Sequence, residues 1–159
     1  MKSYQDQIKD YRSYKKMIAS NGPATAMEKD AKNCAVLALS AAFEIPYDYA
    51  DAFARVQWKR KSRRGTNTNA IINTMKSATS NSPVFEKVAK ECNVINVYVT
   101  PKKLVNCRSK LYTFANNNKK GTYYVLTRGH ALVVKDGQIL DGTKPGSAVR
   151  YAWKIEDAK

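Results

Sequence analysis

The spacing of apolar residues divides the chain into a helical first part and a stranded last part. In the first part apolar residues recur every three or four positions, as they do on a helix with one buried face. From Thr122 the period falls to two, which is typical of half-buried strands. Helices are predicted over 3–19, 34–42, from 47 onward and over 69–76, and strands over 122–128, 130–135, 138–140 and 149–155.

The middle of the chain carries weaker signals. Residues 84–92 predict a helix, and the β-branched run 94–99 predicts the first strand. Pro101 suits the first position of a helix. That helix would have one apolar face, made of Leu104, Cys107, Leu111 and Phe114. Helices first and an antiparallel sheet last indicate an α+β fold, with N-terminal helices packed on a C-terminal sheet. Without repeats or a clear linker, residues 1–159 predict a single domain.

Three local patterns make finer predictions. Asp136-Gly137 predicts a tight hairpin turn. The N-terminal helix, within residues 1–22, carries a stripe that predicts a core or docking face, formed by Tyr4, Ile8, Tyr11 and Ile18 with Tyr14 near its edge. The last strand predicts one buried face and one wet face, since Val149, Tyr151, Trp153 and Ile155 alternate with Arg150, Ala152 and Lys154.

Positive charge dominates the composition. The 28 Lys and Arg residues exceed the 13 Asp and Glu residues, which gives a formal net charge of +15. Such a charge favours nucleic acid or an acidic protein as a partner. Residues 55–64 hold six cations and no anion. This run is either a solvated face or a polyanion contact with an aromatic side chain for stacking, formed by Trp58, Lys59, Arg60, Lys61, Arg63 and Arg64.

The cysteines and the N-terminus bear on the compartment. Three widely spaced cysteines, Cys34, Cys92 and Cys107, argue against a disulfide framework and for a reducing compartment. The N-terminus has no apolar run typical of a signal peptide, and no stretch is long and apolar enough to cross a membrane. We therefore expect a cytoplasmic protein with no membrane partner. The cysteines and His130 form no C-x₂-C pair, so the sequence predicts neither a metal site nor a cofactor.

Candidate chemistry centres on Cys34. Asn33 predicts the N-cap of an Ala- and Leu-rich helix, so Cys34 falls in its first turn, where the helix dipole favours thiolate. A lone cysteine at a helix start is more often a buried, inert part of the core. His130, the single histidine, begins a predicted strand, and Asp141 follows the next strand. The three could act as nucleophile, base and orienting acid, although spacing alone does not bring Cys34 to the other two.

Three stretches resemble the papain-like cysteine peptidase fold in its compact bacterial and bacteriophage form. They are Asn33-Cys34-Ala35 with the following Ile45-Pro46-Tyr47, then Gly65-Thr66-Asn67-Thr68, and then 121–131 with its continuation through Asp141 to Trp153. The resemblance covers residues 28–155. It implies that Cys34 is the nucleophile, His130 the base and Asp141 the orienting residue of a hydrolase that attacks an amide of a peptide or protein. A phage protein of this kind would act in the host cytoplasm.

One position departs from the family pattern. In the related peptidases a glutamine six residues before the cysteine donates to the oxyanion, whereas this chain has Glu28 there. An ionised carboxylate accepts hydrogen bonds and cannot donate them. Either Glu28 is protonated, or another donor such as Asn33 or a backbone N–H serves. The third alternative is a scaffold with weak or no activity, used as a basic binding protein for nucleic acid or an acidic host protein.

Overall fold

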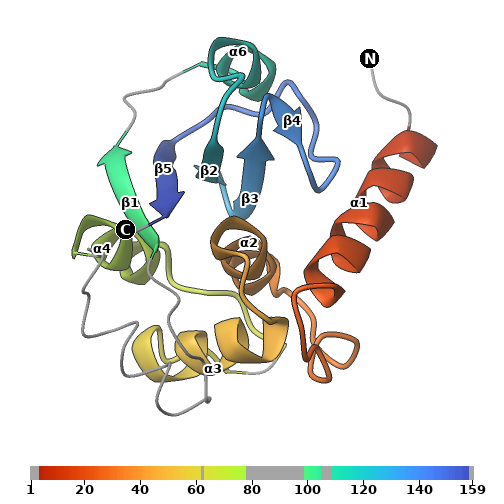
Figure 1. Ribbon diagram of the computed structural model, residues 1–159, viewed down its shortest axis with the longest axis vertical. Helices are drawn as coiled ribbons and strands as arrows, with labels where there is room; N and C mark the ends of the chain where they lie inside the picture. Colours follow the sequence, from red (N-terminus) through yellow and green to blue (C-terminus); the bar gives the residue numbers. More distant parts are fainter. Residues whose placement is uncertain (1–3, 62, 78–98, 105–108, 158–159) are drawn as a thin grey trace.

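A computed structural model describes residues 4–61, 63–77, 99–104 and 109–157. The helices are α1 (Tyr4–Ala19), α2 (Cys34–Phe43), α3 (Tyr47–Gln57), α4 (Thr68–Ser77) and α6 (Leu111–Asn117). The strands are β1 (Val99–Leu104), β2 (Thr122–Thr127), β3 (His130–Lys135), β4 (Gln138–Ile139) and β5 (Tyr151–Asp157). The strands form one antiparallel sheet in the order β1-β5-β2-β3-β4 (Figure 1). The predicted α+β fold is confirmed.

The sheet separates two apolar clusters. Along β2, Tyr124 and Leu126 face the larger cluster, to which α1, α2, α3 and α4 contribute. Tyr123 and Val125 point to the other side, where α6 supplies Leu111 and Phe114. This alternation follows from the two-residue period of a strand. Because both faces are covered by helices, the central strands are buried on both sides.

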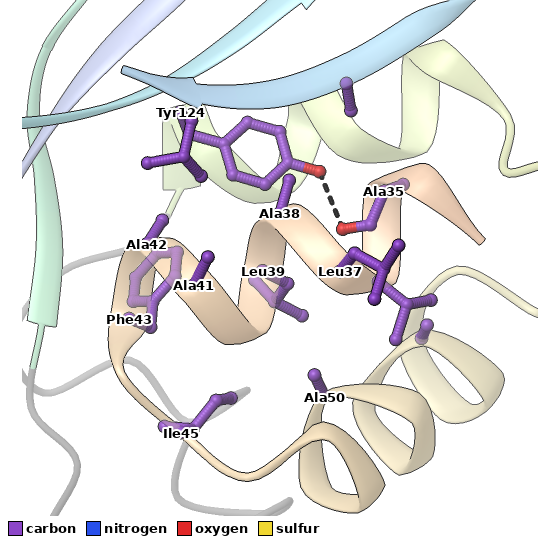
Figure 2. Close-up of a cluster of buried hydrophobic side chains, with 14 of the residues drawn as sticks. Ala35, Leu37, Ala38, Leu39, Ala41, Ala42, Phe43, Ile45, Ala50 and Tyr124 are labelled. Atoms are coloured by element: carbon purple, nitrogen blue, oxygen red, sulfur yellow. Dashed lines mark hydrogen bonds between the residues drawn. The ribbon is translucent and has the colours of Figure 1, made fainter. Parts of the chain in front are cut away.

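Helix α2 lies at the centre of the larger cluster. Every residue of α2 after Cys34 is buried, between the sheet on one side and α3 on the other (Figure 2). Its small alanine side chains let neighbouring backbones approach closely. The Tyr124 hydroxyl donates to the carbonyl oxygen of Ala35 over 3.0 Å, which ties the first turn of α2 to the sheet (Figure 2). The N-terminal end of α2 therefore has a fixed position relative to β2.

Most predicted elements in the outer parts of the chain are confirmed. Helices α1, α2, α3 and α4 lie where the apolar spacing predicts them, as do strands β2 to β5 with end shifts of one or two residues. Asp136 and Gly137 have φ angles of 49° and 79°, the left-handed pair that a type I′ hairpin requires. This hairpin joins β3 to β4.

The helix predicted from Pro101 is wrong at its start. Val99–Leu104 is strand β1, whereas Leu111–Asn117 is helix α6. Pro101 is compatible with β1 because this strand lies at an edge of the sheet, with an irregularity in pairing between Pro101 and Lys103. The predicted helix over 84–92, the strand over 94–98, and both Cys92 and Cys107 lie outside the described residues.

Two side-chain predictions also need correction. Tyr14 and Ile18 of α1 are buried, but Tyr11 is 39% exposed, so the buried stripe runs through Tyr14. Ala152 is buried because α6 covers the face of β5 that the alternation assigned to solvent. Among the described residues, no helix is both long and apolar enough to cross a membrane.

Candidate active site

The start of α2 and the start of β3 bring Cys34 and His130 together. A two-residue turn over Arg128 and Gly129 joins β2 to β3, and its tightness requires the positive φ of 69° at Gly129. His130 is thus the first residue of β3, against which α2 packs. Cys34 and His130 both line one cavity, and the interaction with His130 is among the causes that lower the pKa of the Cys34 thiol. The fold therefore brings Cys34 close to His130, which the spacing of the two residues in the sequence does not show.

The β3–β4 hairpin returns the chain so that Asp141 meets the imidazole. His130 Nε2 lies 2.7 Å from Asp141 Oδ2, and the carboxylate is buried. Because Nε2 donates to this carboxylate, Nδ1 is the nitrogen left for the Cys34 sulfur. Asp141 therefore holds both the tautomer and the orientation of the ring.

Thr143 completes this arrangement. Its hydroxyl donates to Asp141 Oδ1 over 2.6 Å, and its backbone N–H donates to the same oxygen over 3.0 Å. Thr143 Oγ1 also lies 3.1 Å from His130 Nε2. Two donors fix the carboxylate, which in turn fixes the imidazole. Sequence reasoning missed Thr143, although an Asp followed two residues later by Thr is a common local turn pattern.

The electrostatics of the pair favour a thiolate and an imidazolium. Burial raises the pKa of Cys34, but hydrogen bonds from His130 and from the backbone of Ala131 outweigh it and leave the thiol pKa below its ordinary value. Burial lowers the pKa of His130, yet the hydrogen bonds to Asp141 and Cys34 raise it to about 10. Both shifts favour the charged pair, a thiolate beside an imidazolium, which is the form that a nucleophilic cysteine requires.

Cys34 and His130 lie in the wall of a cavity of about 390 Å³. The other lining residues come from the loop before α2, from the segment leading into α4 and from the β2–β3 turn: Lys32, Ala35, Gly65, Thr66, Thr68, Ile71, Leu126, Thr127, Gly129 and Ala131. Residues of the Gly65–Thr68 segment singled out in the sequence thus line the same space as the thiol. Thr66 Oγ1 is buried here without a hydrogen-bond partner among the described residues. The cavity has room for an extended group beside the sulfur.

The structure confirms Asn33 as the N-cap residue of α2, and it gives the side chains of Asn33 and Glu28 partners other than Cys34 and His130. Asn33 is the N-cap of α2, but its side chain makes no capping bond and instead donates to the Tyr47 hydroxyl over 3.0 Å. The Glu28 side chain is 76% exposed and lies 3.8 Å from Lys15 Nζ. Glu28 is also absent from the described lining of the Cys34 cavity. The backbone N–H of Cys34 is among the four that a helix start leaves without an intrahelical partner, so it is a candidate oxyanion donor.

A buried ion pair holds the loop that leads into Cys34. Arg60 donates to both carboxylate oxygens of Asp30, over 2.8 and 3.0 Å, and to the carbonyl oxygen of Ala31 over 3.1 Å. The two charged side chains are 0% and 3% exposed. The Tyr47 hydroxyl donates to Asp30 over 2.8 Å and accepts from Asn33. These bonds fix residues 30–33, directly before the nucleophile, against α3 and the segment after it.

This ion pair corrects the prediction for the basic run. Arg60 is committed to Asp30, and Trp58 is buried, with its indole N–H donating to Thr74 Oγ1 over 2.8 Å and its ring edge-on to Phe53. Neither side chain can contact a polyanion. The exposed members are Lys59, Lys61, Arg63 and Arg64. The alternation of buried and exposed cations depends on the tertiary partner Asp30, which sequence spacing does not reveal.

Within the described residues, no group of three His, Cys, Asp or Glu side chains is placed to hold a metal ion. The reactive groups that the site brings together are the thiol of Cys34, the imidazole of His130 and the buried carboxylate of Asp141. Comparison with protein-family models, with curated proteins and with solved structures finds no match for this chain.

Proposed function

We propose that the protein is a cysteine hydrolase of papain-like architecture, which attacks an amide carbonyl and forms an acyl-thioester on Cys34. The observation that carries this proposal is the placement of Cys34 and His130 in the wall of one cavity, with His130 hydrogen-bonded to the buried Asp141. Its support is chemical: the base contacts the nucleophile, and the orienting carboxylate contacts the base.

The reaction follows from the charges of the resting pair. The Cys34 thiolate adds to the carbonyl carbon, and the resulting oxyanion accepts from the Cys34 backbone N–H. The imidazolium then transfers its Nδ1 proton to the leaving nitrogen, the C–N bond breaks, and an acyl-thioester remains. His130 next removes a proton from water, which attacks the thioester carbonyl. Breaking the C–S bond releases a carboxylic acid and restores the thiolate and the imidazolium.

Peptidases, amidases and deamidases share this first half-reaction and differ in the amine that leaves. The second function that we consider is a basic binding protein on the same scaffold, for nucleic acid or an acidic host protein. The exposed cations Lys59, Lys61, Arg63 and Arg64 favour it. The two functions differ in one property, because only the hydrolase forms a covalent acyl intermediate.

Trapping of that intermediate tests the proposal. The protein is mixed with acetylglycine p-nitrophenyl ester, quenched in acid and digested, and the mass of the peptide containing Cys34 is measured. We expect acylation at Cys34 in the wild type, with p-nitrophenol released faster than in Cys34→Ala and in His130→Gln. Exposed lysines react equally in all three proteins and serve as an internal control. A wild type that releases p-nitrophenol no faster than Cys34→Ala would contradict the hydrolase function.

A further inference from the structure

A second cavity, of about 450 Å³, adjoins the catalytic residues on the side of α1. It is lined by Tyr11, Arg12, Lys15, His130, Asp141, Gly142 and Thr143. His130 lines both this cavity and the one that contains Cys34. An amide held between the Cys34 sulfur and His130 therefore has room to extend into both spaces. The two cavities are where the groups flanking the attacked bond would lie.

Both cavities carry cations that the catalytic series does not use. Arg12 and Lys15 line the α1 side, and Lys32 lines the Cys34 side. Arg12 is exposed and has no acidic partner among the described contacts. Lys15 is close to Glu28, but that carboxylate is 76% exposed and 3.8 Å away, a geometry that holds an ion pair only weakly.

The carboxylate that faces the α1 cavity is already committed. Asp141 accepts from His130 and Thr143, so its charge is balanced by the imidazolium. The exposed cations Lys59, Lys61, Arg63 and Arg64 precede Gly65 in the chain, and Gly65 lines the Cys34 cavity. A substrate that enters the site thus meets positive side chains on both sides of the reacting atoms.

We infer that the substrate is an acidic polypeptide segment, with carboxylate side chains flanking the attacked amide and held by Arg12 and Lys15 on one side and Lys32 on the other. This inference rests on the proposed function, since it places the substrate around the thiolate. An acidic peptide is favoured over nucleic acid because it supplies the carbonyl that the catalytic series attacks. In addition, the tryptophan of the basic run is buried and offers no stacking surface.

Affinity labels test this inference without a known substrate. Bromoacetyl-Glu-Glu-amide and bromoacetyl-Gln-Gln-amide have nearly the same shape and differ in two charges. We measure the rate constant for alkylation of Cys34 by each label and divide it by the rate constant for the reaction of the same label with free cysteine. An exposed ion pair is worth about a three-fold gain in the alkylation rate constant for each carboxylate. With two carboxylates, we expect the Glu-Glu label to react roughly ten-fold faster than the Gln-Gln label. The preference should shrink in high salt.

Two double variants separate the cavity from net charge. Arg12→Gln with Lys15→Gln removes two cations from the cavity, whereas Lys9→Gln with Lys16→Gln removes two exposed cations of the same helix that do not line it. The first variant should lose most of the preference for the Glu-Glu label, and the second should retain it. Equal reactivity of the two labels in the wild type, or equal losses in both variants, would overturn the inference.

Two further outcomes assign a failure to its cause. If both labels react with Cys34 in a His130-dependent manner but at equal rates, the acidic substrate is excluded while the hydrolase function stands. If labelling does not depend on His130, the proposed function itself fails. Protection of Cys34 by a single-stranded oligodeoxynucleotide, at concentrations where a glutamate peptide of equal charge gives none, would assign this surface to nucleic acid and overturn the inference.

Discussion

Arg60→Gln should destabilise the fold far more than loss of any other cation in the basic run. The Arg60 side chain is fully buried, with Nη1 at 2.8 Å from Asp30 and 3.5 Å from Asp51. Removing the guanidinium leaves two carboxylates near each other without their shared cation. Glutamine supplies fewer donors and no charge, so it cannot restore the bidentate contact.

The magnitude follows from the burial of the pair. Breaking a buried ion pair by removing one partner costs about 3–5 kcal/mol. Asp30 keeps its hydrogen bonds from Tyr47 and from the backbone of Ala31 and Arg63. We therefore expect the lower end, about 3 kcal/mol. In a domain of this size that corresponds to a fall in melting temperature of roughly 6–12 °C.

Urea and thermal unfolding of Arg60→Gln at pH 7 measure this loss. Lys61→Gln is the matched control, since it removes the same charge from an exposed neighbour and should change the unfolding free energy by less than about 0.5 kcal/mol. In a double-mutant cycle, Asp30→Asn should recover part of the loss caused by Arg60→Gln. Equal stabilities of Arg60→Gln and Lys61→Gln would refute the reasoning and return Arg60 to the exposed surface.

Three other predictions concern the site and its support. Thr143→Val should lower the rate of Cys34 alkylation and any turnover by about ten-fold. The reason is that Asp141 loses a charge-assisted hydrogen-bond donor worth about 1.5–3 kcal/mol, of which relaxation of the site recovers part. Thr127→Val, in the lining of the Cys34 cavity, is the control. Glu28→Gln should change either rate by less than about two-fold, since its carboxylate points to solvent; an increase of about 10² would place it at the oxyanion instead. Burial raises the pKa of Asp30, but its hydrogen bonds from Arg60, Arg63 and Tyr47 hold that pKa well below the ordinary 3.8. The ionised Asp30 therefore stabilises the fold above pH 3.8, and this contribution is lost as the pH falls below that value. Between pH 6 and 2 the free energy of unfolding should fall less steeply in Asp30→Asn than in the wild type.

The elements at the two ends of the chain are predictable because local patterns determine them. The apolar run after Cys34 can only be a buried helix, and the Asp136-Gly137 turn fixes the hairpin that brings Asp141 back toward His130. From these elements the sequence predicts three of the residues that meet at the site. Their meeting itself depends on packing between α2 and β3, a contact across about a hundred residues that no local pattern encodes.

The errors arise where a tertiary partner overrides the local signal. Pro101 is as compatible with an edge strand as with a helix start, and pairing with β5 decides between them. Arg60 and Lys61 are neighbours with the same charge, but only Arg60 reaches Asp30. Tyr11 and Tyr14 lie on adjacent parts of one helix, and the position of α1 beside the sheet determines which is buried.

The pH dependence of Cys34 alkylation tests the central claim, the thiolate–imidazolium pair, most directly. Iodoacetamide reacts with the thiolate, so its rate at Cys34, followed by mass spectrometry from pH 5 to 10, reports the thiol pKa. The wild type should reach half its maximal rate below pH 9.0, the ordinary thiol value, because His130 lowers the pKa of Cys34. In His130→Gln the imidazolium is lost while the burial of the thiol remains, so the midpoint should move to higher pH than in the wild type. A wild-type midpoint near pH 9.0 that does not change in His130→Gln would contradict the pair and the mechanism built on it.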